Sequence, residues 1–385
     1  MTRALGLFLV VALFAGVGAG EAGTEVLQLG ERRAEALPDS LFAHLVQRLS
    51  GPGMEYNTDN LVSNERSYLH VIGEMERRGV RGGAFVGVGP DQGFSYIATI
   101  EPEVALILDI RRDNLLLHLL YKAIFEASPT RVEFLAHLFG KPVPSEASQW
   151  IGRGIGDVLA YVEGASTDAP LVEERHDWVS ERVQGYGIPL DEEDVATIRR
   201  FHQEFIDHGP DLKYSTYDRG ARPVDPSYRQ LVLETDLQGR EMSFLATTER
   251  YAIIREMSQK NRIVPVVGDL AGEHALQEIG RYLEEIQLPV SVLYASNVEF
   301  LLWEGGVLGA FVENVAALPL APGALLIRSI MGRPGRTHPH NVRGYYSTQS
   351  LQTLESLVNA YRAGEYRSYN ELVTRHAIDS GVGMS

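Results

Sequence analysis

The chain has 385 residues, a formal net charge of −16, 44% hydrophobic residues and no cysteine. This length and composition are typical of a globular protein with a substantial core, and the negative charge argues against general nucleic-acid binding, which requires a basic face. The lack of cysteine excludes disulfides and a lipid-modified bacterial N-terminus. The expected partner is therefore a small molecule and not a nucleic acid.

The N-terminus has the pattern of a secretory signal peptide. Arg3 precedes the apolar run Ala4–Ala15, and small residues follow it. Val17 and Ala19 fit a cleavage site, so residues 1–19 are expected to be removed. The run is short for a membrane span, and an uncleaved N-terminal anchor is the alternative. The expected location is the periplasm or the extracellular space, with no stable membrane span after cleavage.

A first block of α/β core is predicted over residues 63–140, after a polar lead-in over residues 20–62. The lead-in holds one short helix, Ser40–Leu49, and a turn-rich loop over residues 51–60. The core block has apolar positions at helical spacing, then short apolar runs typical of buried strands. The expected elements are a helix Glu65–Arg78, a strand Ala84–Val86, a helix Phe94–Ile100, a strand Val104–Leu108 and helices Asn114–Glu126 and Thr130–Gly140.

Residues 141–259 interrupt this alternation of strands and helices. Their amphipathic segments predict helices and almost no strands, with a Tyr-, Pro- and Asp-rich loop over residues 209–236. We interpret the region as a helical insertion. It is expected to cover the ligand edge of the sheet, and a remote dimerisation element is the alternative.

Alternation resumes over residues 260–385. Strands are expected at Ile263–Val267, Pro289–Leu293 and Gly323–Ile330, with a last strand at Gly344–Ser347 before a helix Gln349–Gly364. A helical stretch, 298–318, is interrupted at Gly305-Gly306. Strands that alternate with helices predict an α/β fold with a doubly wound, mostly parallel, Rossmann-like sheet.

The candidate ligand site lies where these strands end. Gly87 and Gly89 follow the first strand, Asp109 ends the second, Asp269 follows the third, and Ser296 and Asn297 follow the fourth. Ligands of open parallel sheets bind beyond the carboxyl ends of the strands. Glycines allow close approach of the backbone, and an acid can accept hydrogen bonds from ribose hydroxyls. The pattern indicates a nucleotide-like ligand, and a glycine turn required only for packing is the alternative.

This order of parts resembles the core of class I S-adenosylmethionine-dependent methyltransferases. The resemblance covers about Ser63–Asn114 and Ile263–Ser347. It implies that Gly87 and Gly89 hold the methionine part of the cofactor, Asp109 the ribose and Asp269 the adenine, while Asn297 faces the substrate as the catalytic position. Three features depart from the family: Phe85 replaces an acid, the insertion is long, and the cofactor is cytosolic whereas the chain carries an export signal.

The segments SNERSYLH (Ser63–His70), GVGPDQGFSYI and DIRRDN also resemble an uncharacterised, exported bacterial protein family. Two classes of function therefore remain open. One is an enzyme that binds S-adenosylmethionine and transfers its methyl group. The other is a non-catalytic binding or structural protein on the same scaffold, with an adapted or closed pocket.

Other candidate sites are weaker. His338 and His340 could share a metal ion, but no matching carboxylate cluster accompanies them, and no metal is predicted. Arg328 and the arginines at 333, 336 and 343 could receive an anion or form a solvated loop. Ser296 lacks the G-x-S-x-G elbow of α/β-hydrolases and is not expected to be a nucleophile.

Overall fold

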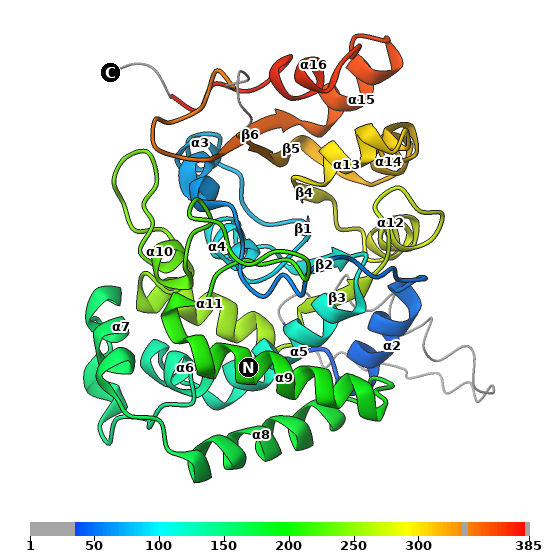
Figure 1. Ribbon diagram of the computed structural model, residues 1–385. Coiled ribbons are helices and arrows are strands. Elements are labelled where there is room, and N and C mark those ends of the chain that lie inside the picture. Colours follow the sequence, from blue (N-terminus) through cyan, green and yellow to red (C-terminus); the bar gives the residue numbers. More distant parts are fainter. Residues whose placement is uncertain (1–34, 333–337, 382–385) are drawn as a thin grey trace, which may run out of the picture.

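The computed structural model describes residues 35–332 and 338–381, so the predicted signal peptide lies outside the described residues. Its centre is a six-stranded sheet in the order β3-β2-β1-β4-β5-β6 (Figure 1). The first five strands are parallel, and β6 is antiparallel to β5. The predicted α/β class with a mostly parallel sheet is confirmed. The strands are β1 (Ala84–Gly87), β2 (Val104–Asp109), β3 (Ile263–Val267), β4 (Val290–Ser296), β5 (Leu320–Met331) and β6 (Ser347–Thr353).

Helices cover both faces of the sheet. From β1 the chain passes through α4 (Gln92–Ile100) and α5 (Arg112–Ala127) toward β3, and it then returns through α12 (Ala275–Glu285) to β4. Because parallel crossovers are right-handed, this reversal of direction puts α4 and α5 on one face, and α12 and α14 (Leu308–Ala316) on the other (Figure 1). The reversal leaves a crevice between the carboxyl ends of β1 and β4, where open α/β sheets bind ligands.

The helical insertion lies mainly against α5 and away from that crevice. Its last helix packs on α4 and α5, and its two long helices pack on α5, below the sheet in the view of Figure 1. Of the insertion's residues, all of which the structure describes, only Tyr214 lines the crevice. The insertion thus covers little of the ligand edge. Its helices are α6 (Arg131–Leu138), α7 (Ile155–Gly164), α8 (Ala169–Gln184), α9 (Glu192–His208), α10 (Tyr228–Val232) and α11 (Thr248–Gln259), with short 3₁₀ turns at Ala147–Trp150 and Gly209–Asp211.

The helix expected from Glu65 and the last expected strand both differ from the sequence-based expectation. The expected helix from Glu65 starts as a 3₁₀ turn, η1 (Arg66–Val71), and only then becomes α3 (Ile72–Arg77). The last strand is β6 rather than 344–347, so residues 349–353 pair with β5 and are not helical. Their polar Ser and Gln side chains are buried, and β6 packs against η1.

The predicted helix over 40–49 and the interrupted helix over 298–318 are both present, whereas α10 lies in a segment predicted as a loop and α16 (Tyr369–Thr374) has no counterpart in the prediction. The break at Gly305-Gly306 separates α13 (Val298–Glu304) from α14, and α2 (Asp39–Leu49) packs on β3 and α12. The C-terminal helices are α15 (Leu354–Arg362) and α16. Within the described ranges, no helix combines the length and apolar character needed to cross a bilayer.

Candidate functional site

A cavity of about 420 Å³ opens at the carboxyl ends of β1 to β4, the region where the sequence predicts a ligand. This volume is within the range of pockets that bind drug-sized molecules. Gly89, Asp109, Asp269 and Asn297 all line it, although they come from four separate parts of the chain. Gly87 does not line it. The structure therefore brings four of the five predicted site residues together.

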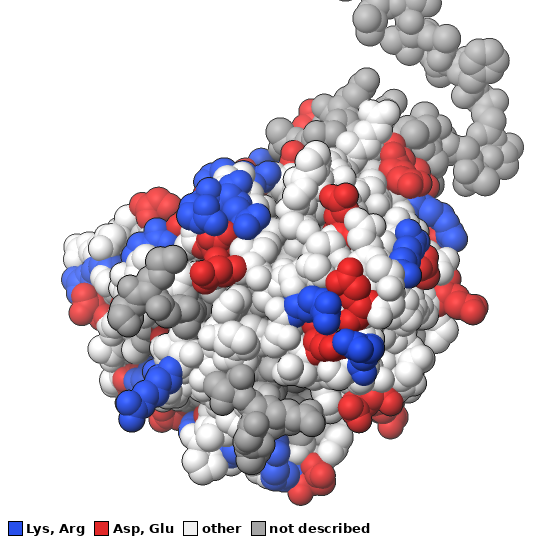
Figure 2. Space-filling view, turned by 90° about the horizontal axis from the view of Figure 1, so that it is seen from above, with Lys and Arg blue, Asp and Glu red and all other residues white. Residues whose placement is uncertain are grey.

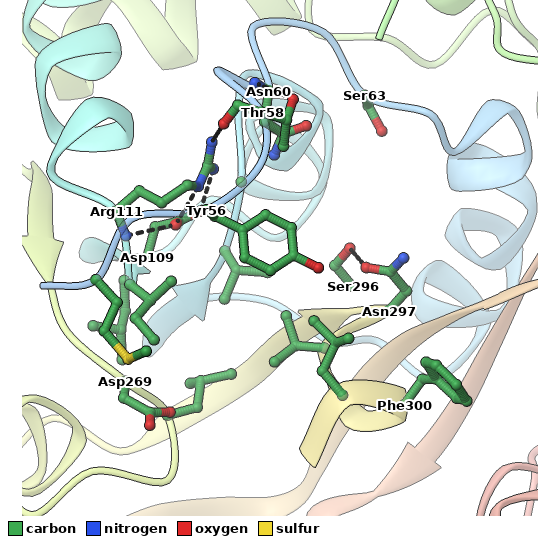
Figure 3. A pocket seen from close by; sticks show the side chains of 18 of the residues that line it. Tyr56, Thr58, Asn60, Ser63, Asp109, Arg111, Asp269, Ser296, Asn297 and Phe300 are labelled. Carbon is green, nitrogen blue, oxygen red and sulfur yellow. Dashed lines mark hydrogen bonds and ion pairs between the residues drawn. The ribbon is translucent and has the colours of Figure 1, made fainter. Parts of the chain in front are cut away.

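The loop of residues 51–60, called the cover segment below, closes one side of the cavity. Its Gly, Pro, Asn and Asp content prevents regular structure, and its backbone is held along the strand ends instead. Gly51 N–H donates to the Val267 carbonyl (2.8 Å), and Met54 N–H donates to the Ile110 carbonyl (2.8 Å). In Figure 3 the ring of Tyr56 projects into the space between Asp109 and Ser296. The cover segment thus supplies an exposed aromatic side chain at the mouth of the cavity.

Asp109 is engaged in an ion pair within the cavity wall. Arg111 donates from Nε to Asp109 Oδ1 (3.0 Å) and from Nη2 to Oδ2 (2.8 Å), and its Nη1 donates to the carbonyls of Thr58 and Asp59. The guanidinium therefore ties the cover segment to the end of β2. Asp109 Oδ2 accepts this single bond and retains acceptor capacity for a ligand hydroxyl.

Gly87 and Gly89 of the glycine turn are required for different physical reasons. Gly89 has a φ of +84°, a left-handed conformation that favours glycine, and it faces the cavity. A Cβ at Gly87 would lie 2.4 Å from the Phe85 ring, so Gly87 is needed for packing. The ring of Phe85, at the position where the methyltransferase resemblance leads one to expect an acid, fills this space. Whether Gly87 contacts a cofactor stays a prediction.

His118 on α5 supports the glycine turn from behind. Its Nε2 lies 3.0 Å from the Gly89 carbonyl oxygen, which can only accept, so the ring carries its proton on Nε2. Burial lowers the pKa of His118 to about 4, so the imidazole is neutral at physiological pH. This histidine fixes the backbone of the turn and is not one of the cavity-lining residues.

Asp269 and Asn297 lie at opposite sides of the cavity (Figure 3). Asp269 Oδ1 accepts from Ala271 N–H (2.9 Å), a turn that fixes the carboxylate at the end of β3. Asn297 Oδ1 lies 3.4 Å from Ser296 Oγ, immediately before α13. Each side chain retains polar atoms for a ligand, as the sequence-based site requires.

Glu65, which the sequence-based reasoning did not select, lies in the wall of the cavity. It is 1% exposed and accepts hydrogen bonds from Tyr294 Oη (2.6 Å), Gln349 Nε2 (2.8 Å) and Ser296 Oγ. Burial raises its pKa, and these neutral donors act in the opposite direction. In the sequence, an acid before an amphipathic helix indicates only a favourable charge at a helix start, so no local signal distinguished it.

Arg328 and His338 have structural roles, whereas the candidate arginines at 333 and 336 lie outside the described residues. Arg328 is not part of a solvated loop, because it is buried and donates to both carboxylate oxygens of Glu299 (2.7 and 3.1 Å). His338 Nε2 donates to the Val373 carbonyl (3.0 Å). Residues 35–332 and 338–381 contain no group of three His, Cys, Asp or Glu side chains that could hold a metal ion.

The charged side chains on the face seen from above are mixed. Figure 2 shows Lys and Arg lying beside Asp and Glu in small groups, with no broad basic area on this face. The arrangement agrees with the negative net charge of the chain. The absence of a nucleic-acid partner stays a prediction.

Comparison with known proteins gives a family but no activity. The model of a domain of unknown function, DUF7790, matches residues 60–384. The chain belongs to this family. A search of curated proteins found no match. The matched range includes all five predicted site residues and Glu65, whereas most of the cover segment precedes it.

Proposed function

We propose that the cavity binds S-adenosylmethionine or a closely related nucleoside. The observation that carries this proposal is the convergence of Gly89, Asp109, Asp269 and Asn297 on one cavity of about 420 Å³ at the reversal point of the sheet. Open α/β sheets bind their ligands at this point.

The charges in the cavity wall favour a cationic nucleoside over a phosphorylated one. The lining contains four carboxyl groups, those of Glu55, Glu65, Asp109 and Asp269, and one guanidinium, that of Arg111. Arg111 is already bonded to Asp109 and to two carbonyls of the cover segment. A nucleotide phosphate would therefore meet an excess of negative charge, whereas a sulfonium ion would be stabilised.

Each residue then has a defined role. Gly89 lets the methionine part approach the backbone, Asp109 Oδ2 accepts from a ribose hydroxyl, and Asp269 accepts from the adenine amino group. Tyr56 can stack on the base at the mouth. In an active methyltransferase, Asn297 would orient the acceptor, and the rate enhancement would come mainly from proximity and alignment. No metal takes part in this scheme.

The predicted export signal is the strongest argument for the alternative, a binding protein without methyl transfer. The N-terminal pattern predicts a protein of the periplasm or the extracellular space, and S-adenosylmethionine is not made in these places. The cavity favours ligand binding of some kind over a closed, purely structural scaffold. N-terminal sequencing of the native protein and cell fractionation decide the location. A chain that begins near residue 20 outside the cytoplasm favours the binding protein, and an intact cytoplasmic chain favours the enzyme.

Titration calorimetry tests the binding proposal directly. S-adenosylmethionine and S-adenosylhomocysteine are titrated into the protein, with ATP as the phosphorylated comparison. Saturable binding of the first two is expected, and it should weaken about tenfold in Asp269→Asn, because one charge-assisted hydrogen bond contributes about 1.5 kcal/mol. Glu355→Gln, an exposed change on α15, is the matched charge control. Lack of saturation by either nucleoside up to about 1 mM, equivalent to about −4 kcal/mol, would refute the proposal.

A further inference from the structure

The buried carboxyl of Glu65 has no cationic partner among the described residues. Its hydrogen-bond donors, Tyr294, Ser296 and Gln349, are all neutral, and so is Ser329, whose hydroxyl also lowers the pKa of Glu65. The other acids of the cavity are in different environments: Asp109 is paired with Arg111, and Glu55 is exposed at the mouth. A buried carboxylate is costly unless it is paired with a cation or heavily hydrogen-bonded. Glu65 is therefore the one cavity acid in the described chain that is both buried and without a cation.

The surrounding network fixes which carboxylate oxygen remains available. Tyr294 Oη accepts from Gln92 Nε2 (3.1 Å) and so donates its own proton to Glu65 Oε2. Gln349 Nε2 also donates to Oε2, and it lies 3.3 Å from the Tyr96 hydroxyl, whose proton goes to the Tyr68 carbonyl. Both Gln349 contacts therefore require its nitrogen at this position. Oε2 is saturated by two donors, whereas Oε1 has one partner in hydrogen-bond geometry, Ser296. The Ser329 hydroxyl is also near enough to lower the pKa of Glu65.

Ser296 connects Oε1 to the open cavity. Its φ of +53° is a left-handed conformation, uncommon for a residue other than glycine, Asn or Asp, and such strain is concentrated at functional sites. Ser296 Oγ contacts both Glu65 Oε1 and Asn297 Oδ1. Three acceptor oxygens, of Glu65, Ser296 and Asn297, thus lie next to one another in the cavity wall. Among them, only the Ser296 hydroxyl supplies a proton for hydrogen bonding.

We propose that Glu65, Ser296 and Asn297 form a subsite for a ligand ammonium group. An ammonium ion supplies three donors and one positive charge. The donors match the three acceptor oxygens, and the charge would favour the ionised form of Glu65, which burial alone disfavours. The subsite rests on the proposed function, because it lies in the same cavity. It specifies which chemical group of the ligand binds at this end of the cavity. The ammonium group has two possible sources: the amino-acid end of the nucleoside itself, or a separate amine substrate.

The decisive variant is Glu65→Gln, which the network can accommodate. The amide oxygen can replace Oε2 and accept from Tyr294 and Gln349, while the amide nitrogen donates to Ser296 Oγ, whose proton then goes to Asn297. Folding is checked by circular dichroism and by the thermal unfolding midpoint. Glu55→Gln, which removes a charge from the mouth of the same cavity, is the matched control.

Three ligands are titrated into each variant by calorimetry: S-adenosylhomocysteine, 5′-methylthioadenosine, which lacks the amino-acid part, and n-butylamine, with n-butanol as its neutral comparison. If the ammonium group belongs to the nucleoside, Glu65→Gln lowers the affinity for S-adenosylhomocysteine at least tenfold and leaves the affinity for methylthioadenosine unchanged. If it belongs to a separate substrate, both nucleosides are unaffected, and n-butylamine binds the wild type and not Glu65→Gln. Either result supports the subsite.

Two results would overturn it. One is a folded Glu65→Gln protein with unchanged affinity for S-adenosylhomocysteine, together with wild-type protein that binds n-butylamine no better than n-butanol. The other is an equal loss of ligand affinity in Glu65→Gln and Glu55→Gln, which would indicate a general charge effect. The proposed function fails separately, because it requires only that the wild type bind the nucleosides. If the wild type binds the amine but neither nucleoside, the ammonium subsite is supported and the proposed nucleoside-binding function is refuted.

Discussion

Replacing Gly89 by alanine tests whether the glycine turn is built for the cavity or only for its own conformation. The residue has a φ of +84°, and a Cβ there would lie 3.1 Å from Gln92 Nε2. The left-handed backbone costs an L-residue about 1–2 kcal/mol. Displacement of Gln92 also weakens its 3.1 Å hydrogen bond to Tyr294, which contributes about 1 kcal/mol. We expect Gly89→Ala to lower the free energy of unfolding by about 2–3 kcal/mol.

Gly239→Ala is the matched control for this experiment. Gly239 has a similar φ of +76°, but a Cβ there would have no heavy atom within 4 Å. It should lose only the backbone contribution of about 1–2 kcal/mol. Urea unfolding followed by tryptophan fluorescence measures both variants, and equal m-values are needed for the comparison.

Ligand binding provides the second measurement. Gly89→Ala is expected to bind S-adenosylhomocysteine at least tenfold more weakly than the wild type, because the new methyl group narrows the approach to the backbone. Gly239→Ala should bind normally. Equal destabilisation of the two variants with unchanged affinity in both would refute the reasoning, since Gly89 would then matter only for its own turn.

Three further predictions concern buried polar groups. Burial raises the pKa of Asp91 to about 7 from 3.8, so the unfolded chain ionises first, and the stability contributed by this group falls as pH rises from about 4 to 7. The free energy of unfolding of Asp91→Asn should therefore equal that of the wild type near pH 4 and exceed it by up to about 4 kcal/mol at pH 8. Urea unfolding at both pH values measures this, and the lack of such a difference would contradict the prediction. His118→Phe should cost about 1–3 kcal/mol in the same assay, because the buried Gly89 carbonyl loses its donor, and a variant as stable as the wild type would show that the bond is dispensable. Arg328→Met should cost about 3–5 kcal/mol by leaving Glu299 buried without its partner, and adding Glu299→Leu should recover much of the loss; an equally unstable double variant would argue against this account.

The sequence predicted the architecture well because the strands are buried on both faces. Continuous apolar runs such as Val104–Leu108 and Ile263–Val267 have few alternatives to a central parallel strand, and the structure has both. The β6 region was harder. Its Ser and Gln side chains, including Gln349, become buried only because the strand pairs with β5 and lies under η1, and no local pattern encodes that contact.

By itself, the sequence determined that Gly89, Asp109, Asp269 and Asn297 follow strands of one sheet, and hence that they share an edge. That conclusion needed only the rule that parallel strands end on the same side. Only the tertiary structure decided that Arg111 pairs with Asp109, that Gly87 makes room for Phe85, and that Glu65 enters the cavity wall. Glu65 and Gln349 are 284 positions apart, and the burial that makes this carboxyl chemically distinctive comes from packing between distant segments. Hydrophobic periodicity reports which face of an element is buried, but it does not report which polar group that burial leaves without a counter-ion.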